Sequence, residues 1–180
     1  QLFVDYFGGS LKDQSTFDNL LNEAKQRFLG KNNVHFIRSS TSEAPKKLAN
    51  SLRENVHLIY VDANHQYETV LDDLIDYLPF LHPHYGLFQL NDCCHSDSGI
   101  KQNLGVLEAS FKFCRMFDFI PLVVVNRDFT DVILAKRGSL ICELIDNTFN
   151  NSNIAYVELP SQLYPVASIK NGVRANLSFV

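Results

Sequence analysis

The sequence predicts an α/β domain built on a doubly wound, mostly parallel sheet, and three observations lead to this prediction. Short apolar runs that suit buried strands alternate with amphipathic runs at helical spacing along most of the chain. The runs at 56–61 and 87–90 each end abruptly in polar side chains, and the amphipathic segment between them makes the two strands parallel. The runs at 119–125 and 130–135 are too close together for a crossover helix, so they predict an antiparallel hairpin at one edge.

The order of the elements follows from two periodicities. Strand-like runs, rich in β-branched and aromatic residues, occur at 2–4, 34–37, 56–61, 87–90, 119–125 and 130–135. Helical runs, with apolar residues three and four positions apart, occur at 16–28, 43–52, 70–81, 100–117 and 139–149. Gly30 ends the first of these helices, and Pro45 fits the first turn of the second. Strands and helices therefore alternate up to the hairpin, and one further helix follows it.

The bulk composition argues against several classes of protein. The 180 residues are 46% hydrophobic and 20% charged, which is ordinary for a globular domain. A net charge of −4 without a basic run gives no reason to expect a nucleic-acid partner. No apolar stretch approaches the roughly 20 residues of a membrane helix, and no signal peptide is visible, so we expect a cytoplasmic protein with no membrane partner. Four cysteines without zinc-ligand spacing are expected to be reduced thiols: Cys93, Cys94, Cys114 and Cys142.

Polar side chains follow the runs at 56–61 and 87–90. Asp62 comes directly after the first run, and Asn91 and Asp92 come directly after the second. Parallel strands place their carboxyl ends on one edge of a sheet, where open α/β sheets bind ligands. Carboxylate and amide oxygens suit Mg²⁺ or Ca²⁺, so these three residues are candidate metal ligands. The alternative is that Asp62 caps the next helix while Asn91 and Asp92 make turn hydrogen bonds.

Two histidines are candidates for general-base catalysis. His65 follows a strand end beside carboxylates, which is an environment that suits proton transfer. His95 lies on the loop after the run at 87–90 and is the second candidate. The alternative for His65 is a surface histidine that hydrogen-bonds to Glu68 or to the backbone.

Two segments and the hairpin carry a resemblance to a known family. Residues 62–68 read DANHQYE and residues 86–92 read GLFQLND. With the hairpin at 119–135, they resemble class I S-adenosylmethionine-dependent methyltransferases, of the bacterial O-methyltransferase type with an Asp-Gly-Asp-His-Ser-Tyr-Glu motif after the fourth strand. The resemblance covers residues 2–137. It implies a Rossmann-like sheet and S-adenosylmethionine as the cofactor, with Mg²⁺ or Ca²⁺ in some relatives.

The resemblance also implies roles for residues outside these two segments. Asp5, after the first strand-like run, matches the acid that binds the cofactor ribose. Ser39 and Ser40 lie where the family's loop contacts adenine, and Asp62 is counted among the cofactor-binding residues as well as the metal ligands. The alternatives are that Asp5 caps the turn at 8–9 and that the two serines cap the following helix.

The sequence departs from the family at its beginning. The family's first strand and Gly-rich turn are not found; position 1 is Gln, and residues 2–4 already read as a strand. We therefore expect residues 1–138 to form an N-terminally incomplete methyltransferase-like domain that begins with the family's second strand. Residues 139–180 are expected to form a C-terminal helix and an extended tail, which packs on its own domain or contacts a second subunit of a homo-oligomer. Ala63 and Asn64 also stand where the family has Gly and Asp.

The resemblance implies methyl transfer from S-adenosylmethionine to a hydroxyl of a sugar or small natural product, so the expected partner is a small-molecule acceptor. The alternative is a non-catalytic module that keeps the methyltransferase-like scaffold for binding or assembly. The missing Gly-rich turn and Asn64 favour the module, whereas Asp5, Asp62, His65 and Asp92 favour the enzyme. A nucleotide-binding enzyme on the same sheet is disfavoured because no phosphate-binding loop is present.

Overall fold

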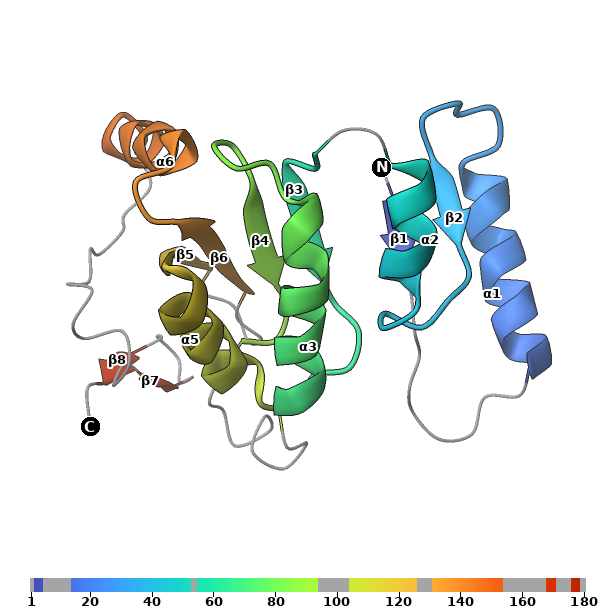
Figure 1. Ribbon diagram of the computed structural model, residues 1–180, viewed down its shortest axis with the longest axis horizontal. Helices are drawn as coiled ribbons and strands as arrows, with labels where there is room; N and C mark the ends of the chain where they lie inside the picture. Colours follow the sequence, from blue (N-terminus) through green and yellow to red (C-terminus); the bar gives the residue numbers. More distant parts are fainter. Residues whose placement is uncertain are drawn as a thin grey trace. The chain divides into compact units, whose positions relative to one another are not determined.

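The computed structural model describes residues 2–4, 14–52, 55–93, 104–125, 131–153, 168–170 and 176–178 (Figure 1). The chain divides into two compact units, Gln1–Ser51 and Leu52–Val180. Each unit alternates strands and helices, as the sequence predicts.

The first unit contains two parallel strands and two helices. The strands β1 (Leu2–Val4) and β2 (His35–Ile37) pair in register, with Phe3 opposite Phe36. The helices are α1 (Gln14–Arg27) and α2 (Ala44–Ser51). The Phe36 ring contacts Phe28, which follows α1, at a centroid distance of 6.0 Å. Gly30 has φ +81, which glycine adopts without strain, and this allows the turn after α1.

The second unit contains a four-stranded mixed sheet in the order β3-β4-β6-β5. The strands β3 and β4 are parallel, and β6 pairs antiparallel with both β4 and β5. The predicted parallel pair and the predicted hairpin are therefore confirmed. The bounds of the four strands are β3 (Leu58–Val61), β4 (Leu87–Leu90), β5 (Phe119–Val125) and β6 (Asp131–Lys136).

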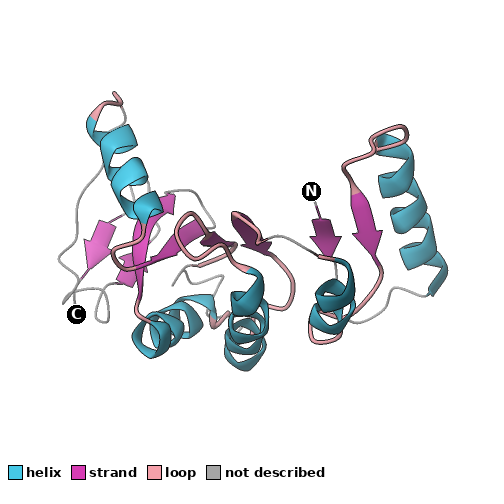
Figure 2. Ribbon diagram, turned by 45° about the horizontal axis from the view of Figure 1, so that its top comes forward, coloured by secondary structure: helices cyan, strands magenta, loops and turns pink. Residues whose placement is uncertain are grey.

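Two helices cover one face of this sheet: α3 (Tyr67–Tyr77), which continues into a 3-10 turn η1 (Leu78–Phe80), and α5 (Val106–Phe117). Figure 2 shows them side by side along the strands. Phe88 of β4 and Phe113 of α5 are fully buried and meet edge to face at 5.6 Å, an arrangement that contributes about 0.5–1.5 kcal/mol beyond area burial. Burial alternates along β4, with Phe88 and Leu90 buried and their neighbours half-buried, which is the pattern of a strand with one well-covered face.

The sequence predicted a single sheet, but the described strands form separate sheets in the two units. Among the strands that the structure describes, β1 pairs only with β2, and β3 pairs only with β4. The run predicted at 56–61 is also shorter as a strand, since Val56 forms an isolated parallel bridge to Leu81 and β3 begins at Leu58. The helix predicted at 100–117 is described from Val106 onward.

The C-terminal part begins with α6 (Leu140–Asn150), which confirms the predicted last helix. It then contains a short antiparallel pair, β7 (Ser168–Lys170) and β8 (Asn176–Ser178), which the sequence did not predict. The boundary expected at residue 138, and a role for the tail in homo-oligomer contacts, stay predictions. Within the described ranges, no helix combines the length and the apolar character that crossing a membrane requires.

Candidate active site

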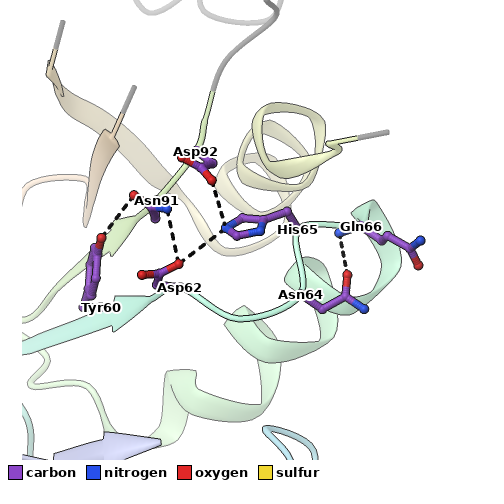
Figure 3. A network of polar contacts seen from close by, with 7 residues as sticks. All are labelled: Tyr60, Asp62, Asn64, His65, Gln66, Asn91 and Asp92. Atoms are coloured by element: carbon purple, nitrogen blue, oxygen red, sulfur yellow. Dashed lines mark hydrogen bonds and ion pairs between the residues drawn. The ribbon is translucent and has the colours of Figure 1, made fainter. Parts of the chain in front are cut away.

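A polar cluster lies at the carboxyl ends of β3 and β4, where the sequence places it (Figure 3). Asp62 directly follows β3, and Asn91 and Asp92 directly follow β4. The Asn91 backbone N–H donates to the Val61 carbonyl at 3.0 Å, which extends the parallel ladder by one step. This bond brings the ends of the two strands together, so the side chains of Asp62 and Asn91 meet.

His65 stands between the two carboxylates of this cluster. Its Nε2 atom is 3.6 Å from Asp62 Oδ1 and 3.7 Å from Asp92 Oδ2. The Nε2 atom is buried and has no hydrogen-bond partner, while the side chain as a whole is 21% exposed. A ring nitrogen beside two carboxylates at the carboxyl ends of two strands has the position of a candidate general base. The ring therefore faces Asp62 and Asp92, not Glu68.

Two hydrogen bonds and one close backbone approach hold the loop that carries His65. Asn64 Oδ1 accepts a hydrogen bond from the Gln66 backbone N–H at 2.9 Å, an Asx turn that leads into α3. The Gly105 backbone N–H, at the start of α5, donates to the His65 carbonyl at 2.8 Å. A Cβ on Gly105 would lie 2.6 Å from the backbone nitrogen of Tyr67, so only glycine lets the two helix starts approach this closely.

Asn91 connects the two strand ends through its side-chain amide. Its Nδ2 donates to Asp62 Oδ1 at 3.2 Å, and its Oδ1 accepts from the Tyr60 hydroxyl at 3.1 Å (Figure 3). Burial and the carboxylates of Asp62, Asp131 and Asp92 raise the pKa of Tyr60 to about 12. Its phenol therefore remains protonated, and remains a hydrogen-bond donor, throughout the neutral range.

The surroundings of Asp92 disfavour the ionised form of its carboxyl group. Burial raises the pKa of its carboxyl; nearby His65 lowers the pKa, and Asp62 and Asp131 raise it, with a net shift upward. Asp92 also has φ +55, in the left-handed region that costs most L-residues about 1–2 kcal/mol. The folded state therefore favours the protonated form of the Asp92 carboxyl more than the unfolded chain does.

We expect Asp92→Asn to raise the melting temperature at pH 7. A raised folded-state pKa means that the folded protein binds more protons than the unfolded chain above about pH 4, so stability falls as pH rises through this window. Asparagine removes the charge and tolerates the left-handed conformation. The melting temperature should rise by about 2–4 °C for each kcal/mol gained in the free energy of unfolding, and this rise should shrink as pH approaches 4.

Asp118→Asn provides the matched control for Asp92→Asn. Asp118 shares φ +55, but it is exposed and pairs with Arg137 at 2.9 Å, so its neutralisation should give no gain. A melting temperature that falls for Asp92→Asn at pH 7, or that rises equally in both variants, would contradict the electrostatic explanation.

The described residues give no support for the predicted metal site. Among the residues that the structure describes, no group of three or more His, Cys, Asp or Glu side chains is arranged to hold a metal ion. Asn91 lies between the predicted ligands but turns its NH₂ group toward Asp62, and its oxygen is occupied by Tyr60. Asp62, Asn91 and Asp92 thus form a hydrogen-bonded cluster, and no metal-ligand role for them is supported.

The predicted cofactor-binding residues lie in part in the first unit. Ser39 follows β2, and its Oγ is buried without a hydrogen-bond partner, which fits a group that contacts a ligand. The Ser40 carbonyl accepts hydrogen bonds from the backbones of Glu43 and Ala44 at the start of α2, and its Oγ lies 3.1 Å from Ser42 Oγ. Asp5 and His95 lie outside the described residues.

Sequence reasoning missed three residues of the site: Tyr60, Gly105 and Asp131. Asp131 begins β6, accepts a 2.7 Å hydrogen bond from Gln89 and acts on the pKa of both Tyr60 and Asp92. The hairpin prediction paired this strand with β5, but its place beside β4, which brings Asp131 to the site, has no signal in the local sequence pattern. Gly105 and Tyr60 carry no signal either.

The strand–helix alternation and the terminal hairpin, with an acid–histidine cluster at the carboxyl edge, define a Rossmann-like methyltransferase fold. A protein-family model described as a methyltransferase domain matches residues 2–101, which is more than half of the chain. The chain therefore belongs to this methyltransferase family. A search of curated protein sequences finds no match.

Solved structures of methyltransferases share the fold. They include a TDP-rhamnose 3′-O-methyltransferase of calicheamicin biosynthesis, with 17% identity and a TM-score of 0.55 over 77% of this chain and 58% of that one. A Staphylococcus aureus protein described as a caffeoyl-CoA O-methyltransferase has 14% identity and a TM-score of 0.53 over 75% of this chain and 63% of that one. The fibrillarin pre-rRNA processing protein of Methanococcus jannaschii has 15% identity and a TM-score of 0.50 over 77% and 56%.

At these identities the similarity establishes the fold. The present chain spans less than two thirds of the length of each of these proteins.

Proposed function

We propose that this protein transfers a methyl group from S-adenosylmethionine to a hydroxyl group of a sugar or another small natural product, with His65 as the general base. The observation that carries the proposal is the buried Nε2 atom of His65, which has no hydrogen-bond partner and lies 3.6 and 3.7 Å from the carboxylates of Asp62 and Asp92. Membership of the methyltransferase family supports the reaction class, and a sugar O-methyltransferase among the similar structures supports the acceptor class.

S-adenosylmethionine, when bound, supplies an electrophilic methyl group on a sulfonium and leaves as neutral S-adenosylhomocysteine. With that methyl group in line, the acceptor oxygen would form the new oxygen–carbon bond as the carbon–sulfur bond breaks, and the electron pair of that bond would stay on sulfur. The proton of the hydroxyl moves to His65 Nε2, and Asp62 and Asp92 stabilise the imidazolium until the proton passes to solvent. Alignment of the acceptor contributes several kcal/mol or more in such in-line displacements.

The cofactor-binding part of the proposal rests on a smaller set of observations. The buried, unpartnered Oγ of Ser39 is the described group that best fits a hydrogen bond to the cofactor. The roles of Asp5 at the ribose and of Asp62 in cofactor binding stay expectations that the resemblance implies. No residue role in this proposal calls on a metal ion, and Asn91 presents its amide NH₂ toward Asp62.

The full protein should form S-adenosylhomocysteine when it is given S-adenosylmethionine and a suitable hydroxylated acceptor. We would screen nucleotide-linked sugars, glycosides and phenolic natural products, and detect both S-adenosylhomocysteine and the methylated product by mass spectrometry. The rate should be the same with EDTA and with millimolar Mg²⁺ or Ca²⁺, because no residue role in the proposal requires a metal ion.

Two results would argue against parts of this proposal. Measurable cofactor binding by calorimetry without product from any acceptor in the screen would favour the non-catalytic module. A Mg²⁺-dependent rise in melting temperature that disappears in Asp92→Asn would restore the metal. Such an ion at a hundredfold excess over its dissociation constant would add about 2.7 kcal/mol of stability, which is readily measured.

A further inference from the structure

The side chain of Tyr60, in β3, reaches the residue that follows β4. In the parallel register Tyr60 is opposite Gln89, and Asn91 lies two residues further along on the same face of the sheet. The Tyr60 side chain reaches along this face, and its hydroxyl donates to Asn91 Oδ1 at 3.1 Å (Figure 3). Although the residue is 50% exposed, its polar end is therefore occupied by the cluster around His65.

The side-chain amide of Asn91 has two orientations that differ by an exchange of oxygen and nitrogen. The Asp62 carboxylate only accepts hydrogen bonds, so it requires the NH₂ group of Asn91 on its own side, where Nδ2 lies 3.2 Å from Asp62 Oδ1. In the other orientation the amide oxygen would face the Asp62 carboxylate, and two acceptors at this distance repel each other. The amide oxygen therefore faces Tyr60, and the Tyr60 hydroxyl adds a second hydrogen bond that holds the amide in this orientation.

We propose that Tyr60 is a positioning residue for methyl transfer, acting on Asp62 and His65 through the orientation of the Asn91 amide. The inference rests on the proposed function, since it assigns a role within that reaction. Its chain of contacts is the Tyr60 hydroxyl to Asn91 Oδ1, Asn91 Nδ2 to Asp62 Oδ1, and Asp62 Oδ1 beside His65 Nε2. Without the hydroxyl, one of the two hydrogen bonds that hold the Asn91 amide is lost, so the amide and the Asp62 carboxylate that it contacts are held less firmly beside His65.

Tyr60→Phe keeps the ring and removes only the hydroxyl, so it isolates this role. We expect kcat to fall roughly tenfold or more, which is the range seen when an outer hydrogen-bond partner of a reactive group is removed. The KM for the acceptor should change little, because Tyr60 acts on the base and not on the bound substrate. Asn91→Ala should have a similar effect, and the double variant should be no slower than Asn91→Ala alone, because both changes break the same chain of contacts.

A second readout does not require an acceptor. The side-chain NH₂ protons of Asn91 should exchange slowly with water and be shifted from their positions in an unfolded chain in the wild-type protein, as expected for a hydrogen-bonded amide. In Tyr60→Phe these resonances should shift and exchange more rapidly with water. Tyr85→Phe is the matched control: Tyr85 is 39% exposed, contacts the ring of His82 and should leave kcat and the Asn91 resonances unchanged.

The inference is overturned if Tyr60→Phe leaves the Asn91 resonances unchanged, or if the effects of Tyr60→Phe and Asn91→Ala on kcat multiply independently. Its failure is distinguishable from failure of the proposed function. If His65→Ala abolishes transfer while Tyr60→Phe has no effect, only the positioning role is wrong. If His65→Ala has no effect either, the proposed base is wrong as well.

Discussion

Replacement of His65 by alanine should lower the rate of methyl transfer by about 10²–10⁴-fold, the usual contribution of a positioned general base. The physical reason is the placement of Nε2, which is buried, makes no hydrogen bond and lies within 3.7 Å of both carboxylates. No other described side chain of the cluster combines a basic nitrogen with this position. Initial rates at saturating acceptor and cofactor, measured from S-adenosylhomocysteine formation, test this expectation.

His84→Ala is the matched control for the loss of an imidazole. His84 is exposed, lies in the turn after η1 and is not part of the cluster at the strand ends. The control should retain the wild-type rate. A His65→Ala variant that keeps at least half of the wild-type rate, with a melting temperature close to wild type, would remove His65 from the mechanism and would direct attention to His95.

Gly105→Ala should reduce both stability and activity. The added Cβ would lie 2.6 Å from the Tyr67 backbone nitrogen, 2.7 Å from its Cβ and 2.8 Å from its Cα, and backbone atoms cannot move aside as a side-chain end can. Either α5 or the start of α3 must shift, which typically costs about 1–3 kcal/mol for added volume in a packed region. The same shift stretches the 2.8 Å bond from the Gly105 N–H to the His65 carbonyl, so His65 moves relative to Asp62 and Asp92. Thermal unfolding and kcat are the two measurements.

Gly30→Ala separates loss of stability from distortion of the site. A Cβ at Gly30 meets nothing within 4 Å, but φ +81 makes alanine unfavourable there by about 1 kcal/mol or more. Gly30→Ala should therefore lower the melting temperature while leaving kcat unchanged. If Gly105→Ala has the melting temperature and the kcat of the wild-type protein, the close contact between the two helix starts does not position His65.

The sequence alone determined the elements up to α6 and their order. Strand runs such as 87–90 and helical runs such as 139–149 were predicted because side-chain periodicity reflects which faces are buried, and burial dominates the choice of secondary structure. The short connection between β5 and β6 predicted their antiparallel pairing. The motif at 62–68 and the polar residues after β4 located the candidate site, because parallel strands present their carboxyl ends at one edge.

Only the tertiary structure decided how the side chains at that edge interact. Asp62, Asn91 and Asp92 suit a metal by composition, but the Asn91 amide donates through its nitrogen to Asp62 and accepts through its oxygen from Tyr60. Asp131 reaches the cluster because β6 inserts between β4 and β5, and strand order cannot be read from local periodicity. Hydrogen-bond direction, burial of a single atom and the closeness of two backbones depend on residues far apart in the chain, so they are properties of the folded protein alone.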